Sequence, residues 1–264
     1  MKFLVHQQPA YVYTGGKDFD AAKPSVVFIH GTANDHSVWT LQARYFAHHG
    51  WNALAIDLPG HGKSFGDAKT SIASSADWLV NLLDNGNIAR AALVGHSLGS
   101  LIALDIAARY PARVSQIALI GSSVPMPVSD VLMEAAINRP AEAFEMLNIW
   151  GHAPHLKWGR NPTPGTSTMM ASKRLLAQSQ SGAVAVDLAA CQAFQIDDAA
   201  LAELKLPALV VAGAIDMLTP AKAAYALAAR LGNASTVTLA DAGHSMMQEA
   251  PGKVVDALKA FLKP

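Results

Sequence analysis

Short apolar runs alternate with longer amphipathic segments along most of the chain. The runs are rich in Val, Ile, Leu and Ala, and they are continuous rather than alternating with polar residues. A strand that is apolar on both sides is buried on both faces, which is typical of a parallel sheet covered by two layers of helices. Six such strands are predicted, at residues 25–30, 52–58, 89–95, 116–121, 207–213 and 235–240.

Segments with helical spacing of apolar residues separate these strands. Five helices are predicted, at residues 38–49, 72–83, 98–110, 220–231 and 252–262. Strands that alternate with helices favour an α/β fold with a mostly parallel, doubly wound sheet. Two further short segments, at residues 2–5 and 10–14, are predicted to form an antiparallel pair at one edge of that sheet.

The segment from residue 123 to residue 196 breaks this alternation. It contains no clear strand, it is rich in Met, and its acidic and basic residues balance. We expect residues 1–122 and 197–264 to form one α/β core, with residues 123–196 inserted as a helical cap over the sheet. The insertion shows no obvious group of cations for binding a substrate carboxylate, although Arg160 or Arg174 could serve in that role.

Composition restricts the classes of function. The chain has 264 residues, of which 51% are hydrophobic, and its formal net charge is zero, so nothing suggests binding to nucleic acid or to anionic lipid. A single cysteine, Cys191, excludes an intramolecular disulfide and fits a reducing compartment. The apolar run at the N-terminus is too short for a secretion signal, and no stretch could span a bilayer, so a cytoplasmic location is expected.

Candidate chemistry begins with a serine between two glycines, in the sequence Gly95-His96-Ser97-Leu98-Gly99. The pentapeptide follows a predicted strand and opens a predicted helix, which is the context of a nucleophile elbow. Such a turn strains the serine backbone and lifts its hydroxyl clear of the sheet. The alternative is an ordinary turn in which the glycines serve only to reverse the chain.

A serine hydroxyl needs a base, and the base needs a group that orients it. Asp216 follows the strand at 207–213, and His244 follows the strand at 235–240. Taken singly, Asp216 could cap the helix that begins near residue 220, and His244 could be a structural histidine. Because all three residues follow the carboxyl ends of predicted parallel strands, where active sites of open α/β sheets gather, a triad of Ser97, Asp216 and His244 is predicted.

An acyl-transfer site also needs donors for the oxyanion. One is expected to be the backbone N–H of Leu98, the residue after the nucleophile. The second should come from the loop after the strand at 25–30, where Gly31 permits a turn that points the Thr32 N–H inward. The Ala33 N–H is the alternative donor.

Five stretches together resemble the α/β-hydrolase fold superfamily: FIHGTANDHSVW, IDLPGHGKS, VGHSLGS, VVAGAIDMLTP and AGHSMMQEAP. The resemblance covers nearly the whole chain except the insertion. It implies a serine-nucleophile, esterase-like member with the triad above and a cap inserted after the sixth strand. Some members carry their acid after that sixth strand, but here the position reads GSSVPMP, with no carboxylate, which supports Asp216. Ser100 stands where relatives often carry glycine or alanine, and the sequence offers no function for it.

The resemblance and the serine together favour hydrolysis of a carboxylic ester through an acyl-enzyme, with no cofactor and no metal. Gly31, Met217 and Met246 are expected to contact a small to medium, largely apolar substrate, although these methionines could instead pack the cap onto the core. A C–C bond hydrolase, a lactonase and a cofactor-free perhydrolase would use the same triad. A small-molecule receptor of the same fold is the alternative from another class. A monomer or a homodimer is expected.

The other motifs in the sequence give little support for a phosphate, dinucleotide or metal site. Gly62-Lys63-Ser64 lacks the earlier glycine of a phosphate-binding loop, because Asp57 stands in that place. No dinucleotide-binding glycine pattern follows a strand. His152 and His155 have a metal-ligand spacing, but Pro154 lies between them and no third ligand is evident. No metal site is predicted.

Overall fold

The computed structural model describes all residues from 1 to 264 and contains one eight-stranded sheet. The strands lie in the order β1-β2-β4-β3-β5-β6-β7-β8. Their bounds are β1 (Lys2–Val5), β2 (Gln8–Tyr13), β3 (Ser25–Ile29), β4 (Asn52–Ile56), β5 (Ala91–His96), β6 (Val114–Ile120), β7 (Ala208–Gly213) and β8 (Ala234–Leu239).

The sheet is parallel except at one edge. Strands β3 to β8 pair in parallel, whereas β1 pairs antiparallel with β2 and β2 pairs antiparallel with β4. Every residue of β3, β4, β5 and β7 is buried, as continuous apolar strands require. The predicted fold class and the antiparallel edge pair are both confirmed.

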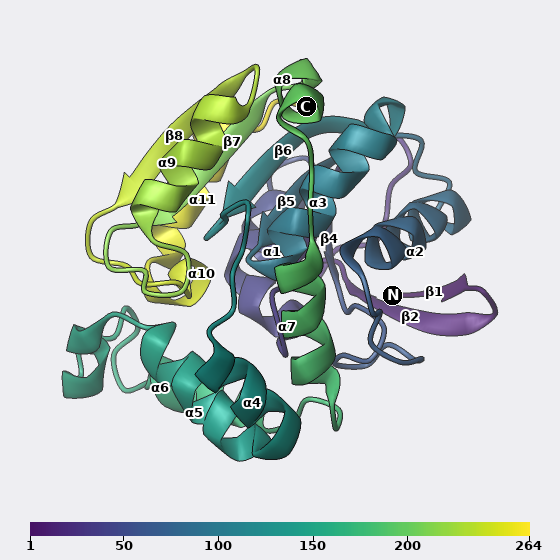
Figure 1. Cartoon of the computed structure of the whole chain (residues 1–264). Helices are drawn as coiled ribbons and strands as arrows, with labels where there is room; N and C mark the ends of the chain where they lie inside the picture. Colours follow the sequence, from purple (N-terminus) through teal and green to yellow (C-terminus); the bar gives the residue numbers. More distant parts are fainter.

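Helices cover both faces of the sheet (Figure 1). One face packs against α1 (Thr40–Ala47), the short α10 (Met246–Glu249) and α11 (Pro251–Phe261). The other packs against α2 (Ile72–Asn85), α3 (Leu98–Arg109) and α9 (Ala221–Arg230). The predicted helix at 38–49 begins instead as a 3₁₀ turn at His36–Trp39, which Asp35 caps by accepting from the Ser37 N–H.

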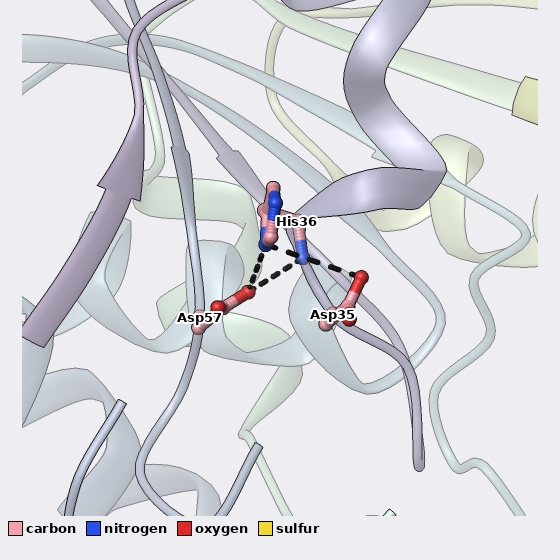
Figure 2. A group of neighbouring side chains, drawn as sticks. All are labelled: Asp35, His36 and Asp57. Atoms are coloured by element: carbon pink, nitrogen blue, oxygen red, sulfur yellow. Dashed lines mark hydrogen bonds and ion pairs between the residues drawn. The ribbon is translucent and has the colours of Figure 1, made fainter. Parts of the chain in front are cut away.

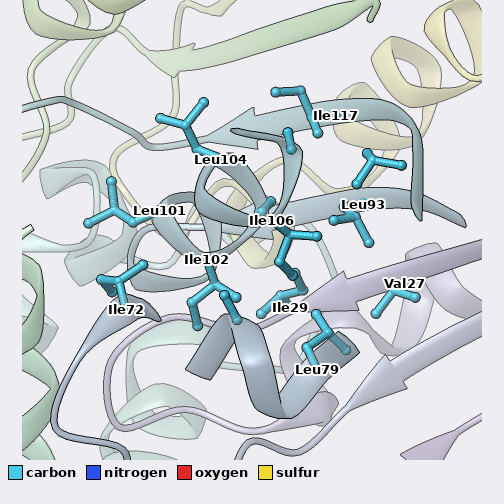
Figure 3. Packing of buried hydrophobic residues seen from close by; sticks show 14 of the residues in the cluster. Val27, Ile29, Ile72, Leu79, Leu93, Leu101, Ile102, Leu104, Ile106 and Ile117 are labelled. Atoms are coloured by element: carbon cyan, nitrogen blue, oxygen red, sulfur yellow. The ribbon is translucent and has the colours of Figure 1, made fainter. Parts of the chain in front are cut away.

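The larger core cluster lies between the sheet and the α2–α3 layer. Figure 3 shows Ile102 and Leu101 of α3 close to Ile29 of β3 and Ile72 of α2. Ten of the twelve residues of α3 are buried, so this helix is apolar almost all round rather than amphipathic. Its N-terminus is therefore held by packing at the end of β5, which is an interior strand of the sheet.

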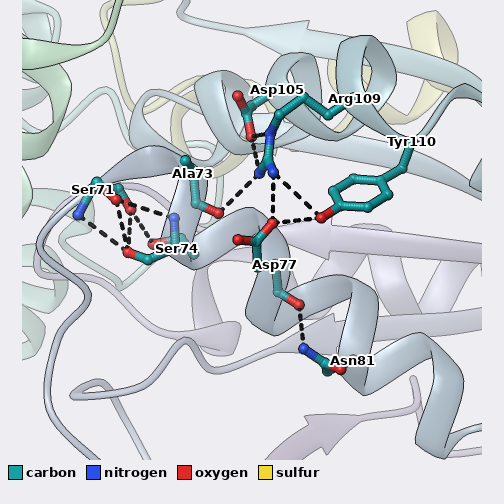
Figure 4. A network of polar contacts seen from close by, with 9 residues as sticks. Ser71, Ala73, Ser74, Asp77, Asn81, Asp105, Arg109 and Tyr110 are labelled. Atoms are coloured by element: carbon teal, nitrogen blue, oxygen red, sulfur yellow. Dashed lines mark hydrogen bonds and ion pairs between the residues drawn. The ribbon is translucent and has the colours of Figure 1, made fainter.

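A polar network joins the outer ends of α2 and α3 (Figure 4). Arg109 donates to Asp105 one turn earlier in its own helix and to Asp77 on α2. The Tyr110 hydroxyl also donates to Asp77, at 2.8 Å. At the start of α2, Ser71 and Ser74 form a reciprocal capping box. The contacts of Arg109 and Tyr110 hold the two helices side by side at the surface, away from the serine.

Residues 123–196, which we call the inserted segment, lie between β6 and β7. Their helices are α4 (Asp130–Asn138), α5 (Pro140–Trp150), α6 (Thr168–Leu176) and α7 (Ala183–Ala193), followed by α8 (Asp198–Glu203) beyond the segment. Figure 1 shows α4, α5 and α6 beyond one end of the sheet, with α7 leading back toward α3. Nowhere in the chain is a helix both long enough and apolar enough to cross a membrane.

Candidate active site

Ser97 occupies the whole turn between a strand and a helix. Strand β5 ends at His96 and α3 begins at Leu98, so one residue must reverse the chain direction. Ser97 does this with φ of 52° and ψ of −121°, a conformation that side chains with a Cβ rarely adopt. The turn is fixed because the Ser97 N–H donates to the Ile120 carbonyl of β6 and the Ser97 carbonyl accepts from α3.

The two glycines of the pentapeptide are required by close backbone approach. A Cβ at Gly95 would lie 2.1 Å from the Gly99 carbonyl oxygen, and one at Gly99 would lie 2.4 Å from the Ile29 carbonyl oxygen. No side chain fits at either distance, so the strand and helix can cross this tightly only with glycine. The sequence context of Ser97 is therefore explained by its geometry.

Ser100 gains a structural explanation that the sequence did not offer. It is fully buried one turn into α3, and its hydroxyl lies 2.5 Å from the Ser97 carbonyl oxygen and 2.7 Å from the Ser122 hydroxyl. Donating to the Ser97 carbonyl leaves the Ser100 oxygen to accept from Ser122. This small chain of hydroxyls supports the strained residue from below.

Asp216 and His244 lie together at the ends of β7 and β8. The His244 Nδ1–H donates to Asp216 Oδ2 at 2.8 Å, and both side chains are almost completely buried. The other carboxylate oxygen accepts from the backbone N–H groups of Leu218 and Thr219, each at 2.8 Å. With Nδ1 occupied, the imidazole keeps Nε2 available as a proton acceptor.

Thr219 is a member of this group that the sequence analysis missed. Its hydroxyl donates to Asp216 Oδ2 at 2.7 Å and lies 3.1 Å from His244 Nδ1. Burial alone would raise the pKa of Asp216, but the hydrogen bonds and charge from His244, with the donors of Thr219, lower it below its ordinary value. The three-residue spacing from Asp216 to Thr219 is that of a local side-chain turn, and it could have signalled the contact.

His96 connects the serine turn to the His244 loop. Its Nε2–H donates to the His244 carbonyl at 2.9 Å. Burial, with the nearby His244 ring, lowers the pKa of His96 to about 3, so it remains neutral and acts as a fixed donor. The histidine of the pentapeptide therefore positions the backbone of His244 relative to Ser97.

The loop after β3 lies directly against Ser97. A Cβ at Gly31 would lie 3.1 Å from the Ser97 Cβ and 2.8 Å from His96 Nδ1, so this position must be glycine. The amides of Thr32 and Leu98 donate to no acceptor in the protein, whereas the Ala33 N–H donates to Asp187 Oδ2 at 2.9 Å. The alternative oxyanion donor is thus occupied, and of the two candidate amides in this loop only that of Thr32 is free.

A cavity of about 360 Å³ opens above Ser97 and His244. The inserted segment supplies most of its wall, and the wall is largely apolar. Its hydrophobic lining residues are Met126, Val128, Leu132, Leu147, Trp150, Leu176, Leu188, Cys191, Met217 and Leu218. No Asp, Glu, Lys or Arg lines the cavity, and the polar side chains in its wall are those of Ser, Thr, Asn and His.

Only one of the residues expected to contact the substrate lines the cavity. Met217 lines the cavity and is 61% exposed, so it lies at the rim. Met246 does not line the cavity, because it is fully buried in the core cluster that packs α1, α10 and α11 against the sheet. Gly31 does not line the cavity either. Arg160 and Arg174 are exposed and lie outside the cavity wall.

A second buried pair ties the inserted segment to the core. His61, in the loop after β4, places Nε2 at 3.0 Å from Asp187 Oδ2 on α7 and Nδ1 at 2.9 Å from the Pro59 carbonyl. Both ring nitrogens face acceptors, an arrangement that favours the ring with a proton on each nitrogen. Burial opposes the charge, but the Asp187 carboxylate outweighs it and raises the pKa of His61.

Raising the pH should weaken the interaction between His61 and Asp187. The folded-state pKa of His61 lies above the unfolded value of about 6.5, so its stabilisation is complete below that value and is lost as the pH rises through the folded pKa. We expect the wild type to exceed His61→Gln in free energy of unfolding at about pH 6, and by less at about pH 9.5. Urea denaturation measures both. The exposed His48→Gln is the matched control, and a difference independent of pH would contradict the expectation.

Asp35, His36 and Asp57 are close enough to suggest a metal site (Figure 2). Their atoms already have partners, however. Asp57 accepts from the His36 N–H and Nδ1–H, both at 2.7 Å, and from the Lys63 N–H at 2.8 Å. Asp35 caps the 3₁₀ turn that carries His36. The cluster is explained by its role in holding the loops after β3 and β4.

Comparison with known proteins gives relatives over nearly the full chain. One is an (E)-2-((N-methylformamido)methylene)succinate hydrolase of Acinetobacter baylyi, 25% identical, with 90% of each chain covered. Another is a 2-hydroxy-6-oxononadienedioate/2-hydroxy-6-oxononatrienedioate hydrolase of Paraburkholderia phymatum, 29% identical, covering 93% of this chain and 89% of the relative. Among solved structures, an enol-lactonase from Burkholderia xenovorans LB400 superposes with a TM-score of 0.87 at 22% identity, with 99% of each chain covered.

The family model for the alpha/beta hydrolase fold matches residues 24–251, which is most of the chain. The match includes the turn at Ser97 and the loops that carry Asp216 and His244. The eight-stranded, mostly parallel sheet flanked by helices agrees with it. The chain belongs to the alpha/beta hydrolase fold family of enzymes.

Proposed function

We propose that this protein is a serine hydrolase that cleaves an uncharged, largely apolar carboxylic ester through an acyl-enzyme on Ser97. The observation that supports it most is the convergence of the strained Ser97 turn and the His244–Asp216 pair on one apolar cavity. Nucleophile, base and orienting acid occupy three separate strand ends, yet they lie at a common site. That arrangement suits acyl transfer.

In the proposed first half-reaction, Ser97 Oγ attacks the ester carbonyl carbon and His244 Nε2 takes the hydroxyl proton. The free N–H groups of Leu98 and Thr32 bind the oxyanion. As the C–O bond to the leaving group breaks, His244 returns the proton and the alcohol departs. A water then attacks the acyl-enzyme with the same proton transfers, which releases the acid and restores Ser97.

The charge of the cavity supports an uncharged substrate. The two relatives named above act, by their names, on a substituted succinate and on a nonadienedioate or nonatrienedioate, each of which carries two carboxylates. The cavity of this chain has no Lys or Arg in its wall to pair with such a group. An unpaired buried carboxylate is strongly unfavourable, so we propose a neutral ester, including its cyclic form, a neutral lactone.

A matched pair of substrates tests this proposal. p-Nitrophenyl butyrate and mono-p-nitrophenyl succinate have acyl chains of equal length, but only the second ends in a carboxylate. We expect kcat/KM for the succinate to be lower by at least about 100-fold, because its charge would be desolvated without a partner. The uncatalysed rate of each ester is subtracted.

A succinate rate equal to or above the butyrate rate would contradict the proposed substrate charge. Turnover of neither ester would contradict simple esterase action and favour the C–C hydrolase or perhydrolase alternatives. Thermal stabilisation by a small ligand without turnover would favour the receptor.

A further inference from the structure

We infer that Asp187 is a positioning residue that sets the oxyanion loop, so that an inserted helix completes the active site. The inference rests on the proposed function. Asp187 lies on α7, far from Thr32 in sequence, and it does not line the cavity. Its influence on the reaction would therefore pass through the loop at residues 31–33.

The first observation is the conformation of Ala33. This residue has a φ of 54°, a left-handed conformation that costs free energy for a residue with a Cβ. Its N–H donates to Asp187 Oδ2 at 2.9 Å, and Asp187 is only 3% exposed. A buried hydrogen bond to a charged acceptor is stronger than one between neutral groups, and here it favours the strained loop geometry.

The second observation concerns apolar packing. A small hydrophobic cluster fills the interior of the inserted segment, and Ala33 is the one buried member that comes from outside that segment. The other buried members are Leu132, Ala135, Ala136, Ala143, Leu176, Val184 and Leu188. The oxyanion loop is thus anchored in the inserted segment by a methyl group as well as by a hydrogen bond.

The third observation is that Asp187 is itself held in place. The same oxygen that accepts from Ala33 accepts from His61 Nε2 at 3.0 Å, and His61 is 2% exposed. The charged pair fixes the carboxylate between two loops of the core. Few alternative positions are open to Asp187, since it and both of its donors are buried.

These contacts bear directly on Thr32. On one side Gly31 fits tightly against Ser97 and His96, and on the other Ala33 is held by Asp187. The free Thr32 N–H between them therefore has a defined direction. An oxyanion donor must lie about 2.7–3.1 Å from the developing charge, so a small rotation of this loop would weaken it in the transition state while substrate binding continues.

The test compares Asp187→Ala and Asp187→Asn with wild type, using p-nitrophenyl butyrate. We expect Asp187→Ala to lower kcat by about 10- to 100-fold with KM within about threefold, because only transition-state stabilisation is lost. Asp187→Asn keeps a carbonyl oxygen that can accept from Ala33, so its kcat should be intermediate. Asp130→Ala, an exposed carboxylate on α4, is the matched control.

A second readout separates positioning from general structural damage. An aliphatic trifluoromethyl ketone forms a tetrahedral oxyanion on the serine, whereas the corresponding methyl carbinol binds without forming one. Across the variants, affinity for the ketone should fall by the same factor as kcat/KM, and affinity for the carbinol should remain constant. A merely loosened cavity would lower both affinities together.

If Asp187→Ala fails to fold, the double variant Asp187→Leu with His61→Leu is assayed in its place. Apolar residues in place of a buried ion pair often preserve stability, and the Ala33 N–H still loses its acceptor. Wild-type kcat and ketone affinity in a folded variant that lacks this acceptor would overturn the inference. Ser97→Ala in the same assay tests the proposed function separately: if it abolishes turnover while the Asp187 variants do not, only the inference fails.

Discussion

Replacing Ser97 with alanine should lower kcat/KM for p-nitrophenyl butyrate by about 10⁴- to 10⁶-fold while the protein remains folded. The change removes the nucleophile and adds no volume at the turn. Alanine at φ of 52° experiences the same strain as serine, so the fold should be retained. The residual rate would reflect binding and the oxyanion donors acting on water.

The control is Ser235→Ala, an exposed serine on β8 far from the cavity, which should leave kcat/KM unchanged. A fluorophosphonate reagent followed by peptide mass spectrometry should label Ser97 in the wild type and nothing in Ser97→Ala. Substantial turnover by a folded Ser97→Ala protein, or labelling at another residue, would contradict the assignment of the nucleophile.

Replacing Asp216 with asparagine should lower kcat by about 10⁴-fold. The amide oxygen can still accept from the Leu218 and Thr219 N–H groups, so the loop should keep its shape. The amide nitrogen would then face His244 Nδ1 as a donor, which favours the tautomer with its proton on Nε2. A proton on that nitrogen prevents it from acting as the base, and no carboxylate remains to stabilise the imidazolium.

The matched control is Asp241→Asn, which lies three residues before His244 but pairs only with Lys253 at the surface. Its kcat should equal that of the wild type, since exposed ion pairs contribute little. The kinetic comparison also needs the thermal unfolding curve of each variant. Near-normal kcat in a folded Asp216→Asn protein would show that another group orients the histidine.

The site could be predicted where its residues follow from local pattern. Ser97 stands between glycines at a predicted strand-to-helix junction, and the structure has a one-residue turn there. Asp216 and His244 each follow a recognisable strand, although only β7 before Asp216 is fully buried: β8 is an edge strand, and most of its residues are exposed or half-buried. Because the carboxyl ends of parallel strands meet at one edge of a sheet, three positions distant in sequence could be expected at one site. The expected roles remain predictions until the variants above are measured.

Contacts between distant segments could not be predicted in this way. Asp187 lies 126 positions from His61 and 154 from Ala33, and no periodicity relates them. From the sequence alone, Asp187 is one charge among a balanced set in the insertion. Only the packing of α7 against the loops after β3 and β4 gives it two buried donors.

The error over Met246 has a related cause. Met246 lies two residues after His244 in the sequence, which suggests that it is near the substrate. The sequence does not show, however, which side of the short helix that begins there faces the cavity. In the structure Met246 is fully buried in the core cluster that packs α10 and α11 against the sheet, whereas Met217, in the loop after β7, remains at the cavity rim. Adjacency in sequence is a weak guide when the backbone turns at that point.

By itself, the sequence determined the strands, the five helices of the core that alternate with them, the sheet type and the strand ends at which chemistry was expected, because these depend on periodicity and on glycines that permit close approach. The tertiary structure decided which loop amide is free, which acid is buried beside which histidine, and that the cavity wall carries no acid, lysine or arginine. These features depend on how the inserted helices sit over the sheet. Side-chain packing between segments far apart in the chain sets that arrangement, and no local pattern encodes it.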